Sequence, residues 1–187
     1  MLVDRLEIPA LPVLLPLGAV LMVLSWWWLR RQGRLTTRRL VVAWALCWYA
    51  VAVLGATMLP AHLSWGPGAG PPATYRILLV PTLSMRRRDF VLNMMMTLPL
   101  AALLHLNFGI VDRLWVVRTG FLLSLSIETT QLVMILTVHG TRWADVNDLL
   151  SNTIGTIVGF VVWHRLMRVE RLRAAVTGVA PQTVRPG

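Results

Sequence analysis

The chain has little charge and almost no cysteine. Only 14% of its 187 residues are charged, whereas 56% are hydrophobic, and the mean hydropathy is +0.65. This balance excludes the ordinary soluble globular class and indicates a polytopic membrane protein. The single cysteine, Cys47, lies inside an apolar run, so neither a disulfide within the chain nor a cysteine-based metal cluster can form.

Lysine is absent, so all 18 basic side chains are arginines, and against eight acids they give a formal net charge of +10. Basic charge on a chain with long charge-free apolar runs fits a membrane protein and requires no nucleic-acid partner. The start of the chain also lacks the basic segment and the small-residue cleavage site of a secretory signal. Its first apolar run is therefore expected to be a retained anchor.

Five apolar stretches are long enough, or nearly so, to cross a bilayer core, which takes about 20 helical residues. They are residues 11–29, 40–59, 90–106, 114–138 and 146–166. A shorter segment, residues 75–83, follows the turn-forming sequence WGPGAGPP and suits an interfacial or re-entrant position. The expected fold class is an all-α integral membrane protein, a bundle of about five transmembrane helices with this segment before the third.

The arginines divide unequally between the two sides of such a bundle. Twelve fall on the side of residues 30–39, 113–118 and the C-terminal segment, and six on the other side. Because arginine-rich ends favour the cytoplasm, the N-terminus is predicted outside and the C-terminus inside a bacterial plasma membrane. Three parts are expected: two N-terminal helices with an outer loop (1–74), a three-helix core (75–166) and a basic, disordered cytoplasmic tail (167–187).

Polar side chains form a predicted stripe on each of the last two spans. Their members recur at i, i+4, i+7 and at i, i+3, i+7, and they are Ser124, Glu128 and Gln131, then Asp145, Asp148 and Asn152. Together with Asn93 from the third span, the stripes are expected to line a polar cleft that opens to the outer face. Glu128 would lie ten residues, or about 15 Å, below the end of its span, near mid-membrane. An acid at that depth costs about 2.5 to 3.5 kcal/mol on insertion scales, which makes it a functional-site candidate.

Arginines accompany these acids on the predicted outer side. Arg86, Arg87 and Arg88 form one group, and Arg142 lies between the last two spans. Guanidinium groups bind phosphate or carboxylate in bidentate fashion, so the arginines are predicted to hold the charged head of a ligand. The alternative is that the group at 86–88 consists of solvated charges that meet lipid headgroups.

Structural interpretations remain open for the same residues. Asp145 and Asp148 can cap the start of the last span, and Asn93 and Asn152 can make hydrogen bonds between helices. These interpretations do not exclude a binding role.

Two further structural interpretations concern pairs of residues. Glu128 and Arg142 can form an ion pair with no other role. The G-x-x-x-G step at Gly155 and Gly159 is typical of close helix packing. The four histidines, which show no metal-ligand spacing, are expected to be surface residues.

A family resemblance rests on the C-terminal pattern. S-x-x-x-E-x-x-Q followed by R-x-x-D-x-x-D-x-x-x-N-T-x-G-x-x-x-G, from Ser124 to Gly159, resembles the signature of the VanZ-like family. The segment NMMMTLPLA resembles the family's upstream element, whereas YRILLVPTL keeps only Pro81 of the stretch usually found before it. The resemblance extends over residues 75–165. It implies an accessory membrane protein that raises resistance to the glycopeptide antibiotic teicoplanin.

Three functions are compatible with these features. The leading hypothesis is a non-enzymatic protein that binds or translocates an amphiphile, such as a polyprenyl-phosphate cell-wall intermediate or a lipoglycopeptide, without a cofactor or metal. The second is an intramembrane hydrolase or transferase on a lipid-linked substrate, with Glu128 as general base and Asp145 and Asp148 as base or metal ligands. The third is a structural module that modulates an unknown partner protein in the membrane.

Overall fold

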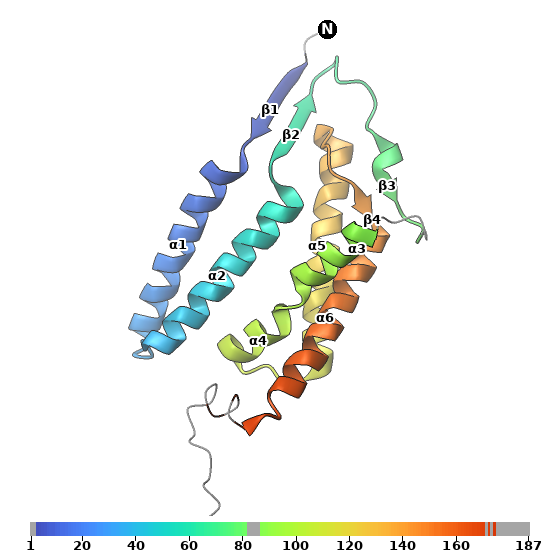
Figure 1. The fold of residues 1–187 in the computed structure, drawn as a ribbon. Helices are drawn as coiled ribbons and strands as arrows, with labels where there is room; N and C mark the ends of the chain where they lie inside the picture. Colours follow the sequence, from blue (N-terminus) through green and yellow to red (C-terminus); the bar gives the residue numbers. More distant parts are fainter. Residues whose placement is uncertain (1–2, 82–86, 171, 173, 175–187) are drawn as a thin grey trace, which may run out of the picture.

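The computed structural model describes residues 3–81, 87–170, 172 and 174 (Figure 1). Arg86 and most of the predicted tail lie outside these residues. The prediction of an all-α bundle with five membrane-spanning helices is confirmed, since five helical segments are long and apolar enough to cross a bilayer. They are α1 (Ala10–Arg31), α2 (Thr37–Met58), α3 (Arg87–Thr97) with α4 (Leu100–Phe108) as the third span, α5 (Arg113–Val138) and α6 (Val146–Leu166).

The sequence did not predict four short strands, which all lie at one end of the bundle (Figure 1). β1 (Asp4–Ile8) pairs antiparallel with β2 (Ala61–Trp65), and β3 (Ile77–Leu78) pairs parallel with β4 (Ala144–Asp145). We call this the strand end. The opposite end carries the α1–α2 turn, the end of α4 and the end of α6, and we call it the arginine end.

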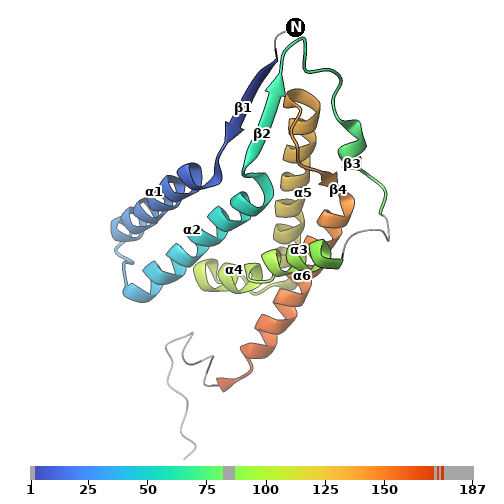
Figure 2. The ribbon, with the colours of Figure 1, turned by 45° about the horizontal axis from the view of Figure 1, so that its top comes forward.

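The third span is broken at Leu98 and Pro99. Proline has no backbone N–H and its ring disfavours a preceding helical residue, so a helix that meets it ends or changes direction. α3 packs on α6, and α4 leads on toward α2, so the two run end to end across the bundle in Figure 2. Gly109, with a left-handed φ of 71°, then ends α4.

Close contacts between small residues hold α6 against its neighbours. A Cβ atom on Gly155 would collide with the backbone of Met94, and one on Gly159 with the backbone of Leu98. On the other side of α6, a Cβ on Gly120 of α5 would collide with the Thr156 side chain. The interpretation of the G-x-x-x-G step as close helix packing is confirmed.

α5 extends well beyond the start of α6 at the strand end. Gly120 lies against Thr156, and Ser124 lies against Asn152, so one further step of four residues brings Glu128 opposite Asp148. α6 begins at Val146, and α5 therefore continues for about eight residues, or roughly 12 Å, past that level. The chain returns along this projecting end through β4 (Figure 1).

This offset changes the expected depth of Glu128. Glu128 lies ten residues before the end of α5 at Val138. However, α6 begins at the level of Glu128, and α2 also ends close to it. Glu128 is therefore level with a helix end. Its depth in the bilayer stays a prediction, because the ends of neighbouring helices are shifted along the bundle axis.

The segment before the third span is short, as expected. Residues 74–76 form a 3-10 turn, η1 (Thr74–Arg76), which leads into β3. The Tyr75 ring meets the Trp143 ring edge-on at 6.1 Å, and the Arg76 side chain donates a hydrogen bond to the carbonyl oxygen of Thr141. Residues 75 and 76 thus pack against the connection between α5 and α6.

Candidate functional site

Three carboxyl groups meet where α6 begins. A carboxylate oxygen of Glu128 accepts a hydrogen bond of 2.8 Å from the backbone N–H of Asp145. The charges of Asp145 and Asp148 act on Glu128, and all three residues are partly buried. We call Glu128, Asp145 and Asp148 the acid cluster.

Asp145 caps α6, so the capping interpretation is confirmed for Asp145 but not for Asp148. Its Oδ1 accepts hydrogen bonds of 2.8 Å from the backbone N–H and from the side-chain amide of Asn147. In a capping box, the side chain three residues into the helix would bind the N-cap N–H. Glu128 of α5 occupies that N–H instead, which leaves Asp148 free to bind elsewhere.

Asp148 binds α3. Its Oδ1 accepts a hydrogen bond of 2.6 Å from the side-chain amide of Asn93. α3, α5 and α6 are thereby joined through one group of polar side chains. These bonds fix the positions of the acid cluster's side chains.

A second polar layer lies about one turn below. The side-chain amide of Asn152 donates to Ser124 Oγ at 3.0 Å, and the hydroxyl of Thr97 donates to the Asn152 carbonyl oxygen at 2.7 Å. Asn152 is 1% exposed, and its Oδ1 has no hydrogen-bond partner among the residues described. Asn93 and Asn152 therefore both make hydrogen bonds between helices, as the structural interpretation predicted.

Gln131 joins α5 to α2 rather than to α6. Its side-chain amide donates to the Thr57 carbonyl oxygen at 3.0 Å, and its own Oε1 is buried without a partner in the described part of the chain. It belongs to the predicted stripe but faces a different helix from the acid cluster.

Arg142 does not pair with Glu128. Its guanidinium donates to the carbonyl oxygen of Leu59 at 2.5 Å, a group left free where α2 ends before Pro60. Across residues 3–81 and 87–170, the one ion-pair contact joins His62 and Glu7 at 3.8 Å. The interpretation of Glu128 and Arg142 as an ion pair is wrong, because the offset of the helices places Arg142 beside the end of α2.

The remaining predicted arginines lie at the start of α3. Arg87 and Arg88 are exposed in its first turn, about one and a half turns from Asn93. Arg86 lies outside the described residues. The structure therefore brings Glu128, Asp145, Asp148, Asn93 and Asn152 together and leaves the arginines at the periphery.

Comparison with known protein families fits this arrangement. The sequence model of the VanZ/LLP1 family matches residues 46–168, well over half of the chain. The chain belongs to the VanZ/LLP1 family. It is thus a multi-pass membrane protein of a family linked to glycopeptide resistance. Comparisons with curated proteins and with solved structures gave no match.

The VanZ/LLP1 match begins inside α2, whereas the motifs that suggested the family begin near residue 75. α2 supplies the Thr57 and Leu59 carbonyl oxygens that bind Gln131 and Arg142. The family region therefore includes the partners of two motif residues.

Sequence reasoning missed part of the polar layer of this VanZ/LLP1 protein. Asp89, Asn93 and Thr97 recur at i, i+4, i+8 and form a stripe on α3. Asn93 and Thr97 both bind α6, and the charge of Asp89 acts on Asp148. The spacing was visible, but a run of methionines and the shortness of the span obscured it.

Two of the four histidines that were expected to be surface residues are half-buried and make hydrogen bonds to distant segments. His139 ends α5 in a left-handed conformation, with its ring nitrogens 3.0 Å from the carbonyl oxygens of Ser64 and Gly70. His105 accepts a hydrogen bond of 3.0 Å from the Trp163 indole. Both residues join segments that are far apart in the sequence.

An apolar groove lies between α2 and α5, beside the acid cluster. It has a volume of about 480 Å³. Its lining comes from both helices and from α4, and consists of Leu46, Tyr49, Ala50, Val53, Leu54, Thr57, Met58, Leu100, Thr119, Leu123, Ser126, Ile127 and Thr130. Ile127 lines the groove, and the next residue, Glu128, belongs to the acid cluster. The groove and the acid cluster therefore adjoin different faces of the same part of α5.

The acid cluster is not arranged as a metal site. Within the described part of the chain, no group of three or more His, Cys, Asp or Glu side chains is placed to hold a metal ion. Its three carboxyl groups can accept hydrogen bonds and carry negative charge.

Proposed function

We propose that this VanZ/LLP1 protein binds or translocates an amphiphile at the strand end, and that this activity contributes to glycopeptide resistance. The supporting observation is that an acid cluster and an apolar groove occupy neighbouring faces of α5. A ligand with a polar head and an apolar chain matches both. A lipid-linked cell-wall intermediate and a lipoglycopeptide are ligands of this kind.

The acid cluster favours a head with N–H or O–H donors. Three partly buried carboxyl groups lie together, and Arg142 is engaged elsewhere. Such a site attracts amine, amide or hydroxyl groups, as on a peptidyl or glycopeptide head, more readily than a bare phosphate. Arg87 and Arg88 at the periphery are available for an anionic part of the same head.

The apolar groove is suited to the ligand's chain. Six of its 13 lining residues are leucine, valine or isoleucine, and four threonine or serine residues and Tyr49 add hydroxyl groups. The Tyr49 hydroxyl is buried and has no partner in the described part of the protein. A chain seated there would lie between α2 and α5, with its head directed toward the strand end.

The strand end is proposed to face outward across a bacterial plasma membrane. Arg30, Arg31, Arg34, Arg38 and Arg39 lie at the opposite end, together with Arg113 and Arg165. Arginine-rich ends are retained in the cytoplasm. The head of the ligand would therefore enter from the outer leaflet, where cell-wall precursors are used.

The test is a double variant, Glu128→Gln with Asp148→Asn. Amides of nearly the same shape keep acceptor oxygens but remove the two charges. Because a hydrogen bond to a charged group contributes about 1.5 to 3 kcal/mol, we expect binding to a fluorescent lipoglycopeptide to weaken about tenfold or more. Protection against teicoplanin in a susceptible host should fall with it, at equal membrane expression.

Glu7→Gln is the matched control. Glu7 lies at the same end of the bundle, in β1, with its side chain 70% exposed and 3.8 Å from the His62 ring. We expect this variant to bind and protect as the parent chain does. Full binding and protection by the double variant would refute the proposed function.

A further inference from the structure

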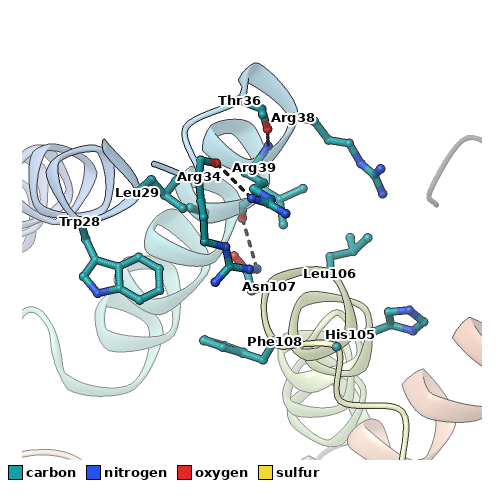
Figure 3. Close-up of a pocket in the computed structure, with 13 residues that line it drawn as sticks. Trp28, Leu29, Arg34, Thr36, Arg38, Arg39, His105, Leu106, Asn107 and Phe108 are labelled. Atoms are coloured by element: carbon teal, nitrogen blue, oxygen red, sulfur yellow. Dashed lines mark hydrogen bonds between the residues drawn. The ribbon is translucent and has the colours of Figure 1, made fainter. Parts of the chain in front are cut away.

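A second cavity, larger than the apolar groove, lies at the arginine end, away from the acid cluster. It has a volume of about 860 Å³ and opens between the α1–α2 turn, the start of α2 and the end of α4 (Figure 3). Its lining is Trp28, Leu29, Arg34, Thr36, Arg38, Arg39, Val42, Ala43, His105, Leu106, Asn107, Phe108 and Gly109. We call it the basic cavity.

Three guanidinium groups and no carboxylate line the basic cavity. Arg39 donates to the Arg34 carbonyl oxygen at 3.3 Å, and Arg34 donates to the Gln32 side chain at 3.4 Å. Both bonds are long, and each uses one of the five N–H donors of a guanidinium. Most of the donors, and all of the positive charge, remain available to an anion.

The start of α2 adds backbone donors to the same cavity. Thr36 caps the helix by accepting a hydrogen bond from the Arg39 backbone N–H at 3.3 Å. The first N–H groups of a helix have no partner within it, and the helix dipole makes this end attractive to anions. Arg38 is in this first turn, so charge and backbone donors act in one place.

The opposite wall of the basic cavity is largely apolar. Leu106 and Phe108, at the end of α4, face the arginines across the cavity (Figure 3). Trp28 closes one side and is 51% exposed, as is typical of a tryptophan at the membrane interface. A group bound here would place its charge among the arginines and its apolar part against α4 and α1.

Hydrogen bonds hold the walls in place. The Asn107 side-chain amide donates to the Val42 carbonyl oxygen at 3.3 Å and joins α4 to α2. His105 is fixed from α6 by the Trp163 indole at 3.0 Å.

We infer that the basic cavity binds the phosphate group of an anionic membrane lipid from the leaflet at the arginine end. Arg34, Arg38 and Arg39 would bind the phosphate oxygens together with the start of α2. The volume exceeds what inorganic phosphate needs, and the apolar wall accommodates the glycerol and first carbons of a lipid. This site shares no residue with the acid cluster, so it is independent of the proposed function.

Native mass spectrometry of the full chain released from nanodiscs tests this inference. The nanodiscs contain phosphatidylglycerol and phosphatidylcholine in equal amounts. The site variant is Arg34→Gln, Arg38→Gln, Arg39→Gln, and the control is Arg113→Gln, Arg118→Gln, Arg168→Gln, which removes equal charge from exposed positions at the same end. We expect the parent and control proteins to retain phosphatidylglycerol preferentially, and the site variant to lose about tenfold or more of it, since charged hydrogen bonds are the strong ones.

A second variant keeps the charge and fills the space. Ala43→Phe places a ring in the lining of the basic cavity, and it should also reduce the retained phosphatidylglycerol. Equal loss from the control variant would overturn the inference in favour of unspecific attraction, and so would full retention by the site variant. Displacement of the lipid by millimolar inorganic phosphate alone would overturn the assignment to a lipid.

Discussion

Glu128 illustrates how one side chain can have both a structural and a functional part. Its carboxylate accepts a hydrogen bond from the backbone N–H of Asp145, the N-cap residue of α6. Glu128 therefore satisfies an N–H group at the start of α6 from the neighbouring helix α5. Its negative charge is not required for that bond, because a neutral oxygen accepts as well. The structural and electrostatic parts can therefore be separated by substitution.

We expect Glu128→Ala to lower the free energy of unfolding by about 1 to 3 kcal/mol, since it leaves the Asp145 N–H without its partner. Glu128→Gln should stay close to the parent protein, because its amide oxygen can accept the same bond. Thermal unfolding in detergent, followed by circular dichroism, measures the difference. Thr129→Ala, at the exposed neighbouring position, is the control. Equal midpoints for the alanine and glutamine variants would contradict this account of the bond.

At the scale of elements, the crossing of α3 and α6 positions the acid cluster. The two helices approach so closely that Gly155 of α6 lies against the α3 backbone at Met94, and Gly159 lies against the backbone of Leu98, just after α3. That approach brings Asn93 within 2.6 Å of Asp148 and Thr97 within 2.7 Å of the Asn152 carbonyl oxygen. A wider crossing would break both bonds.

We expect Gly159→Ala to destabilise the protein by about 1 to 3 kcal/mol through overpacking. The added methyl group would meet the Leu98 carbonyl, which is backbone and cannot rotate away. Val162→Ala, on an exposed position of the same helix, should change stability much less. Unfolding midpoints in detergent test the pair, and an unchanged midpoint for Gly159→Ala would show that the helices are not in close contact.

At the scale of the whole molecule, the two ends differ in chemistry. The strand end holds the acid cluster and the projecting part of α5, whereas the arginine end holds the basic cavity. A ligand at the acid cluster therefore meets charge of the opposite sign from a ligand in the basic cavity. The orientation of the chain decides which leaflet each site serves.

We expect a membrane-impermeant thiol reagent to label a cysteine at the strand end of intact cells. Cys47→Ala removes the native thiol. In that background Pro67→Cys, in the exposed turn after β2, should react at once, and Gln32→Cys, in the α1–α2 turn, only after permeabilisation. The arginine distribution is the physical reason. The reverse labelling pattern would invert the proposed orientation.

Local pattern explains which elements the sequence could predict. A membrane span is recognised by the length of its apolar run, so the sequence predicted all five spans. The last span has the predicted bounds of Val146–Leu166. The Asp145 cap and the packing role of Gly155 and Gly159 follow from neighbouring residues on one helix. The polar stripe of α3 was equally readable from its spacing but was missed.

The sequence by itself determined the five helices, the polar stripes on the last two, the family and the unequal charge of the two ends. Only the tertiary structure decided that Glu128 lies level with the start of α6 and that Arg142 binds the end of α2. Helical periodicity fixes the direction of a side chain around its own axis. The shift of one helix along another comes from packing contacts between distant segments, such as Gly120 against Thr156, and no single stretch of sequence encodes it.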